Sequence, residues 1–354
     1  MSRESEQHVL VADIGGTHGR FALFRLAPAS AGSGAPLALS LTRRVVFRTR
    51  EQRTTTELLS RLYKDGEEAA LLGTGAPSPA AAVLAIPAPT KGKDPLAEPD
   101  RDECCPCPNI SWPICWSEAA AVLGLANIHL VNDFVAQGYA CGALPEALDP
   151  APVFPGDAVP GAPIALMGAG TGFGQCLIRP GKMPAVDPSE GGHSLFPFVG
   201  GEEYRYADFL HEHTPGVPLI KDLVLSGQGL ALLYTFHTGK KAPVEDVPGL
   251  LAEDEDGHAR VLEWYARFYA RACREYVLYT LPLGGIYITG GMATRVPGLF
   301  SHPAFAAEFK NSPAMRAILE KIPVFHVRNQ AAGLWGAAVF AAFALHGPRD
   351  LAIA

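Results

Sequence analysis

The segment His129–Gln137 sets an amide and a carboxylate directly after an apolar run. The run ends at Val131 and is typical of a buried strand, and a small-residue helix is predicted behind it. A carboxylate at the carboxyl end of an interior strand lies where open α/β sheets bind their ligands. Asp133 is therefore a candidate general base, with Asn132 beside it as a polar contact. The alternative is that Asp133 only caps the following helix, because aspartate is a preferred N-cap.

A glycine-rich turn near the N-terminus joins two apolar segments. The strand Val9–Ala12 is followed by Asp13-Ile14-Gly15-Gly16-Thr17 and by a second strand, Arg20–Phe24. This pattern predicts a β-hairpin whose glycines let the backbone approach a ligand and point N–H groups at a phosphate. The turn lacks the Gly-Lys-Ser/Thr of a nucleotide P-loop, which disfavours that class.

The same form returns in the second half of the chain. Ile164–Met167 and Gln175–Ile178 are predicted strands, and the turn between them contains Gly170, Thr171 and Gly172. One glycine-rich loop is usually a plain tight turn. Two such hairpins favour a nucleotide held between two domains of similar build.

Two further glycine pairs stand beside groups that bind sugars or nucleotides. Gly191 and Gly192 separate Glu190 from His193, so a tight reversal of the backbone lets both side chains face one pocket. A carboxylate and an imidazole suit hydrogen bonding to neighbouring hydroxyls. Gly290-Gly291 follows the predicted strand Gly285–Thr289, a junction against which a nucleotide's sugar and base can lie.

The composition bounds the class of protein. With 354 residues, 48% apolar and 18% charged, the chain has room for two domains with separate cores. A net charge of −7 without a long basic run argues against nucleic acid or an anionic membrane as the main partner. No stretch approaches the roughly 20 apolar residues of a membrane span. Met1–His8 is charged and lacks the apolar core of a signal peptide, so we expect a cytoplasmic enzyme.

The remaining pattern predicts alternating strands and helices, and hence an α/β fold. Further strands are expected at 39–47, 81–86 and 324–327, and helices at 56–64, 260–281 and 331–345, with a short one through Gly124 that Ser117 caps. The acidic, proline-containing segment 240–258 is expected to be an exposed loop.

Four of the seven cysteines gather in one proline-rich segment, at positions 104, 105, 107 and 115. A zinc site requires paired Cys-x-x-Cys spacing or a nearby histidine, and this segment offers neither cleanly. The pattern favours reduced thiols in a surface loop over a metal site.

Several short motifs, taken together, resemble the bacterial glucokinase family of the hexokinase/actin-like ATPase superfamily. They occur in the order of that family and span nearly the whole chain: Ala12–Thr17, Asn109–Trp112, Val131–Phe134, Gly168–Gly172, Glu190–His193, Leu225–Gly229, Ile288–Gly291 and Gly333–Gly336. The related ROK kinases carry a cysteine-rich zinc motif after their Glu-x-Gly-His stretch. No cysteine follows His193 until Cys273, so that branch is not favoured.

The resemblance implies a two-domain actin-like/hexokinase fold, with sugar and Mg-ATP in a cleft between a small domain (1–143 plus 329–354) and a large one (144–328). By position, Asp133 resembles the base that accepts the proton of the sugar 6-hydroxyl. The other implied sugar contacts are Asn132, Glu190, His193 and Asp222. The implied ATP contacts are Ala12, Asp13, Ile14, Gly15, Gly16 and Thr17, then Gly170, Thr171 and Gly172, with Gly290 and Gly291 near the adenosine.

The expected activity is therefore that of a cytoplasmic, glycolytic ATP:D-glucose 6-phosphotransferase that forms a homodimer. Two positions depart from the family pattern: Asp222 stands where glutamate is usual, and His18 stands where asparagine is usual. The shorter carboxylate opens the alternative of a kinase for another hexose or an amino sugar. A sugar-binding regulator without turnover is the alternative from another class.

Overall fold

The computed structural model describes residues 6–29, 36–64, 70–253 and 258–354. Part of the Met1–His8 stretch and residues 254–257 of the predicted acidic loop lie outside these ranges. The chain forms two compact units. The first unit comprises Met1–Asp149, Ile178–Pro188 and Ala331–Ala354, and the second comprises Pro150–Leu177 and Ser189–Gln330.

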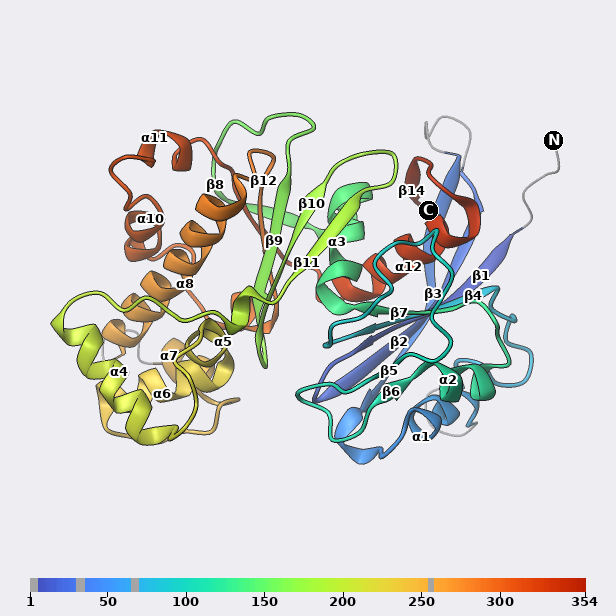
Figure 1. Ribbon diagram of the computed structural model, residues 1–354, viewed down its shortest axis with the longest axis horizontal. Helices are drawn as coiled ribbons and strands as arrows, with labels where there is room; N and C mark the ends of the chain where they lie inside the picture. The colour runs from blue at the N-terminus through green and yellow to red at the C-terminus, as the bar shows by residue number, and fades with distance from the viewer. Residues whose placement is uncertain (1–5, 30–35, 65–69, 254–257) are drawn as a thin grey trace. The chain divides into compact units, whose positions relative to one another are not determined.

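The first unit is built on a six-stranded sheet in the order β14-β3-β2-β1-β4-β7 (Figure 1). β1, β2 and β3 form an antiparallel meander, β4 and β7 continue parallel to β1, and β14 pairs parallel with β3. The strands are β1 (Gln7–Ile14), β2 (His18–Pro28), β3 (Leu37–Arg48), β4 (Ala81–Ile86), β7 (Ile128–Asn132) and β14 (Leu351–Ile353). A separate ribbon pairs β5 (Cys104–Cys105) with β6 (Ile114–Cys115).

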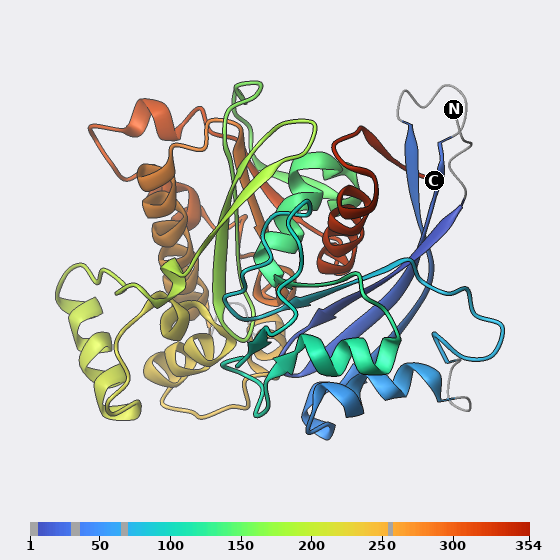
Figure 2. The same ribbon diagram turned by 45° about the vertical axis from the view of Figure 1, so that its right-hand side comes forward.

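Alternate residues of these strands face two layers of helices. Leu10 and Leu84 pack with α1 (Thr55–Ser60) and α2 (Trp116–Leu123) in one core. On the other face, α3 (Asp133–Ala143) and α12 (Ala332–His346) pack on each other, and α12 contacts β1 and β4 (Figure 2). α12 is almost wholly apolar and buried, as its small, aromatic-rich sequence predicts.

The second unit has a sheet in the order β11-β10-β9-β12-β13-β8. β9, β12 and β13 run parallel, and β8 is antiparallel to β13. Its strands are β8 (Pro150–Phe154), β9 (Ile164–Ala169), β10 (Phe173–Arg179), β11 (Ala185–Ser189), β12 (Gly285–Thr289) and β13 (Val324–Val327).

The long helix α8 (Ala259–Thr280) carries the aromatic core of the second unit, where Trp264, Tyr265, Phe268 and Tyr269 are buried. The other helices are α4 (Gly201–His213), α5 (Lys221–Leu225), α6 (Gly227–Thr238), α7 (Val247–Glu253), α9 (Gly291–Arg295), α10 (Pro303–Phe309) and α11 (Arg316–Leu319). Short 3₁₀ turns occupy Thr49–Glu51, Arg61–Tyr63, Pro145–Leu148 and Gly191–His193.

The predicted α/β class and both glycine-rich hairpins are confirmed. Two local predictions are wrong, and one helix was not predicted. Ser117 lies inside α2, whose N-cap is Cys115. The segment expected as an exposed loop contains α7, which forms because Val247 and Leu251 bury themselves against the core. Helix α4 was not predicted, since it buries only a narrow stripe. Within the described ranges, none of the helices combines the length and apolarity that a bilayer crossing requires.

Candidate active site

The first glycine turn, residues 15–17 between β1 and β2, is stabilised by one hydrogen bond between its two ends and by two hydrogen bonds from Thr49. Gly15 N–H donates to the His18 carbonyl at 2.9 Å. Thr49 donates twice to the turn, from its hydroxyl to the Gly15 carbonyl at 2.8 Å and from its backbone N–H to the Thr17 carbonyl at 3.0 Å. Ala12 and Ile14 bury their side chains in the sheet, while Thr17 is exposed at the tip. The turn therefore presents backbone on a rigid base.

Asp13 is the next-to-last residue of β1, close to this turn, and its side chain is mostly shielded from solvent. Its carboxylate accepts from Arg20 Nη1 at 3.3 Å and is 18% exposed. A Cβ on Gly333, in the first turn of α12, would lie 2.7 Å from the carboxyl carbon. Burial raises the pKa of Asp13, and the Arg20 charge opposes that rise. The N-terminus of α12 adds a favourable dipole for an anion here.

Asn132 and Asp133 mark the junction of β7 with α3. The N-cap of α3 is Asn132, whose Oδ1 accepts from Phe134 N at 3.0 Å and from Val135 N at 3.1 Å. Its Nδ2 donates to the Ala88 carbonyl at 3.2 Å. The N-cap position is therefore held by Asn132, and Asp133 is the first residue of the helix and partly exposed. Its Oδ1 nevertheless also accepts from Phe134 N, at 2.9 Å.

β7 is the last strand of its sheet, which corrects the expectation of an interior strand. Its residues are nevertheless buried because the segment after β4 covers its outer edge. Gly92 lies so close to the Leu130 carbonyl that a Cβ would be 2.3 Å from the oxygen. The Thr90 hydroxyl accepts from Asn132 N at 3.1 Å. The covering segment therefore fixes the backbone immediately before Asp133.

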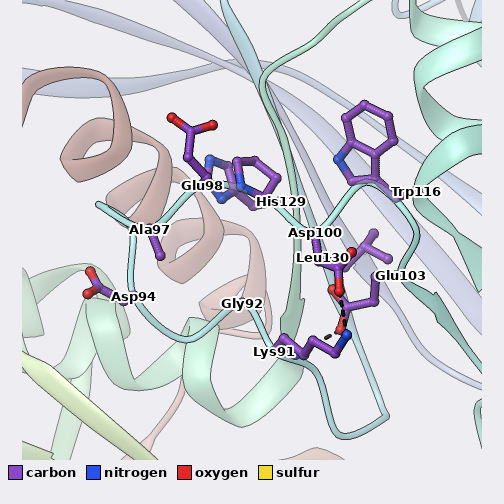
Figure 3. Close-up of a pocket in the computed structure, with 11 residues that line it drawn as sticks. Lys91, Gly92, Asp94, Ala97, Glu98, Asp100, Glu103, Trp116, His129 and Leu130 are labelled. Carbon is purple, nitrogen blue, oxygen red and sulfur yellow. Dashed lines mark hydrogen bonds and ion pairs between the residues drawn. The ribbon is translucent and has the colours of Figure 1, made fainter.

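A small cavity lies under this covering segment (Figure 3). It is lined by charged residues of the segment together with Trp116, His129 and Leu130. Lys91 pairs with Asp100, and Lys91 N donates to Glu103 Oε1 at 2.8 Å, so the segment is tied to itself across the cavity. None of the predicted site residues is among those that line it. The cavity therefore lies between β7 and the segment that covers it, and not at the predicted site.

The cysteine-rich segment differs from its prediction. Cys104 and Cys115 are disulfide-bonded across the β5–β6 ribbon, and Cys105 and Cys107 are buried, so the expected reduced surface thiols are not what the fold contains. Burial raises the pKa of Cys107 to about 12, and the neighbouring charge of Asp133 adds to the rise. No cluster of three potential metal ligands occurs among the described residues.

The loop closed by this disulfide contains Asn109, which packs directly on the first glycine turn. A Cβ on Gly16 would lie 2.7 Å from the Asn109 Cβ and 2.8 Å from its carbonyl oxygen. Glycine is therefore required at position 16 by close approach of the chain. This contact gives the Asn109–Trp112 motif a structural role.

In the second unit, the turn Gly170–Gly172 is braced by residues from two helices. Gly170 N–H donates to the Gly172 carbonyl at 2.7 Å, and Gly227 N–H, at the start of α6, donates to the Gly170 carbonyl at 3.0 Å. Gly290, with φ of 96°, passes so close to Ala169 that a Cβ would be 2.4 Å from its carbonyl oxygen. The Gly290–Gly291 junction therefore lies beside the turn.

Asp222 reaches the same turn from α5. Phe173 N–H donates to Asp222 Oδ1 at 2.5 Å. Burial raises the pKa of this carboxyl, while the Phe173 N–H and the His193 ring act to lower it. The pairing joins residues 49 positions apart and has no local sequence signal.

Glu190 and His193 point their side chains toward each other on the surface of the second unit. His193 Nε2 is 3.9 Å from Glu190 Oε2, and each side chain is 57% exposed. Gly192 is pressed against the Phe173 carbonyl, where a Cβ would be 2.0 Å from the oxygen. The glycine pair thus produces the expected reversal, and it sets the two polar groups next to the second turn.

Each unit therefore gathers its own share of the predicted residues. The first unit holds the Ala12–Thr17 turn, Asn132 and Asp133. The second holds the Gly170–Gly172 turn, Glu190, His193, Asp222 and the Gly290–Gly291 junction. Sequence reasoning missed two supports of these groups, Thr49 and Thr90. It quoted Gly227 and Gly333 within motifs but gave them no role.

Comparison with known proteins adds the context of a family. A family model described as Glucokinase matches residues 10–344. The glucokinase of Nostoc punctiforme is 30% identical over 284 residues, which cover 72% of this chain and 83% of that protein.

Solved structures agree in fold. The glucokinase of an Antarctic psychrotroph has a TM-score of 0.72 at 25% identity, covering 94% of this chain and 98% of that one. A ROK-family glucokinase from Streptomyces griseus, solved with glucose and AMPPNP, has a TM-score of 0.58 at 16% identity, covering 94% and 98%. The two-domain, actin-like α/β fold is therefore shared.

The family model spans nearly the whole chain and takes in both glycine turns, the β7–α3 junction and the Glu190–His193 pair. On these grounds the chain belongs to the glucokinase family and is a hexose kinase.

Proposed function

We propose that this hexose kinase transfers the γ-phosphoryl group of Mg-ATP to the 6-hydroxyl of D-glucose, with Asp133 as the general base. The observation that carries the proposal is the position of Asp133 as the first residue of α3, on a backbone fixed by the Asn132 cap and by Thr90. A carboxylate on a rigid element can orient a hydroxyl and take its proton as the new bond to phosphorus forms. Its relatives are named glucokinases.

On this proposal the two glycine turns bind the phosphates. Both turns are braced, the Ala12–Thr17 turn by Thr49 and the Gly170–Gly172 turn by Gly227. Backbone N–H groups on such turns stabilise charge on transferring phosphoryl oxygens. Gly290 and Gly291 then lie against the adenosine. The ROK neighbour solved with AMPPNP supports a nucleotide of this kind.

Magnesium fits the donor set around the first turn. Asp13 supplies hard oxygen ligands, and burial raises its pKa even beside Arg20, so a bound cation would favour its charged form. Mg²⁺ carried by the nucleotide would neutralise phosphate charge at this position.

The sugar contacts on this proposal are Asn132, Asp133, Glu190, His193 and Asp222. The Asn132 amide is already engaged by its helix cap and by Ala88, so we infer that it acts mainly by fixing Asp133, with one N–H left for a hydroxyl. Glu190 and His193 form an exposed acceptor and ring pair suited to vicinal hydroxyls. Closure of domains 1–143 plus 329–354 and 144–328 over both ligands, a homodimer, and a glycolytic role in the cytoplasm complete the proposal.

The test is the variant Asp133→Asn in an ADP-release assay with Mg-ATP and glucose. We expect kcat to fall by about 10²–10⁴, because the amide cannot accept the proton, while the Kd for glucose stays within a few-fold of the unmodified protein. The control Asp208→Asn makes the same chemical change on exposed helix α4 and should retain full activity. A near-normal kcat in Asp133→Asn rules out the base.

The alternative of another hexose or an amino sugar is motivated by Asp222, since its carboxylate is engaged by Phe173 N–H. Steady-state turnover on glucose, mannose, fructose, glucosamine and no sugar separates the cases. Turnover confined to another sugar would change the proposed substrate and leave the proposed mechanism unchanged. Binding of a sugar without any turnover favours the regulator.

A further inference from the structure

The contact between Asp222 and the second glycine turn has a consequence beyond sugar binding. Asp222 is in the first turn of α5, and its Oδ1 accepts the N–H of Phe173, the residue that follows Gly172. A Cβ on Gly172 would lie 2.5 Å from that same Oδ1. The carboxylate therefore fills the space that the missing side chain of Gly172 leaves, and it fixes the end of the turn.

The other side of Phe173 meets the Glu190–His193 segment. The Phe173 carbonyl lies against Gly192, and the His193 ring is near enough to Asp222 to lower the pKa of that carboxyl. Phe173 is itself buried against Tyr269, with ring centroids 6.1 Å apart, so the residue has little freedom to shift. Phe173 thus connects the Gly170–Gly172 turn, the Asp222 carboxylate and the Glu190–His193 segment.

The backbone at the start of α5, which carries Asp222, is also held by several hydrogen bonds. Lys221 N–H donates to the Ser194 carbonyl at 3.0 Å, and Lys221 Nζ bonds the Ser194 hydroxyl at 2.9 Å and Glu275 at 3.1 Å. These bonds fix the start of α5 to the residue directly after His193. The start of α5, which carries Asp222, and the Glu190–His193 segment are therefore joined by one set of hydrogen bonds.

We propose that Asp222 is a positioning residue for the nucleotide: through the Phe173 N–H it holds the Gly170–Gly172 turn in its binding conformation, and it couples that turn to the Glu190–His193 segment. The inference rests on the proposed function for the identity of the two ligands. A carboxylate acceptor makes a stronger hydrogen bond to a backbone N–H than a neutral group does. An aspartate suits this role because its short side chain fits against Gly172, where a longer one would have to bend.

The test compares three variants by titration with Mg-AMPPNP in the absence of sugar. Asp222→Ala removes the acceptor, and we expect the nucleotide Kd to rise about tenfold, as for loss of a charge-assisted hydrogen bond. Asp222→Asn keeps an oxygen at the same position and should restore the Kd to within about threefold of the unmodified protein. Gly172→Ala displaces the carboxylate from the other side and should weaken nucleotide binding as Asp222→Ala does. The charge control is again Asp208→Asn.

Hydrogen exchange at the peptide containing Phe173 supplies a readout that does not depend on either ligand. The amide should be protected in the unmodified protein and in Asp222→Asn, and should exchange faster in Asp222→Ala and Gly172→Ala. If Asp222→Ala does not fold, Gly172→Ala carries the same comparison.

The proposal is overturned if Asp222→Ala raises only the sugar KM and leaves both nucleotide affinity and Phe173 protection unchanged, because Asp222 is then a sugar contact alone. It is also overturned if Asp222→Asn is as weak as Asp222→Ala. Failure of the proposed function has a different signature: the unmodified protein shows no sugar-dependent turnover. Loss of Phe173 protection in Asp222→Ala still supports the positioning role in that case.

Discussion

The two glycine turns have the same outline in sequence and are supported in different ways. The first turn carries its own aspartate, Asp13, in the strand that leads into it, and that carboxylate pairs with Arg20 on the returning strand. The second turn has no acid of its own. It takes Asp222 from α5, and the carboxylate is bound by a backbone N–H.

Their packing also differs. Gly16 is in tight contact with Asn109, on a loop closed by a disulfide, whereas a Cβ on Gly170 would meet nothing within 4 Å. The first turn is thus enclosed by chain from its own unit, and the second leaves open space at its tip. Similar motifs can therefore be held by a covalently closed loop in one place and by a single carboxylate in another.

Among the changes that test this difference between the two turns, loss of the disulfide is expected to have the largest effect on stability. The bond Cys104–Cys115 closes a loop with a sequence separation of 11, and loops of this size contribute about 3 kcal/mol to stability. Replacing both cysteines with serine should lower the urea midpoint, and adding reductant should lower that of the unmodified protein equally. Reductant should leave the double variant unchanged.

Thiol counting checks the same bridge directly, because bridged cysteines do not react as free thiols. Protein purified without reductant and then denatured should titrate five free thiols, because seven cysteines less the two bridged ones leave five. A count of seven before reduction contradicts the disulfide.

The variant Gly16→Ala tests the packing of the first turn. The new methyl group would clash with Asn109, and overpacking of this kind costs about 1–3 kcal/mol, so the melting temperature should fall. Gly170→Ala is the matched change in the open turn and should keep the stability of the unmodified protein. Equal destabilisation by both changes would remove the contrast between the turns.

The smallest expected effect concerns the charge on Asp222. Its pKa in the folded protein is raised above 3.8 by burial, so above pH 3.8 the unfolded state loses the proton first and stability falls as the pH rises to the folded pKa. Asp222→Asn removes this cost, and its melting temperature at pH 7 should be slightly higher than that of the unmodified protein. The gap should narrow as the pH is lowered toward 3.8. A lower melting temperature at pH 7 would mean that the charge is stabilising.

The sequence predicts what depends on local chemistry. The glycine turns, the strand before Asn132 and the reversal that joins Glu190 to His193 follow from glycine freedom and apolar patterning, and the structure has all of them. It could not predict the contacts of Gly16 with Asn109, Gly333 with Asp13, or Phe173 with Asp222, because each joins distant segments through tertiary packing. Helix α4 was not predicted because few of its residues are buried, Tyr206 and Leu210 among them, so its apolar pattern in the sequence is weak.

The first unit is made of segments from both ends of the chain, and this affects how the protein folds during synthesis. Its helix α12 packs on α3 and against β1 and β4, and its Gly333 lies against Asp13, yet this segment is made only after the whole second unit. Domains usually fold as units, in the order in which they emerge from the ribosome. Here the second unit has all of residues 189–330 before α12 exists, so the first unit, although begun earlier, is completed last. The apolar side chains of β1 and β4 that α12 covers therefore stay exposed until the end of the chain has been made.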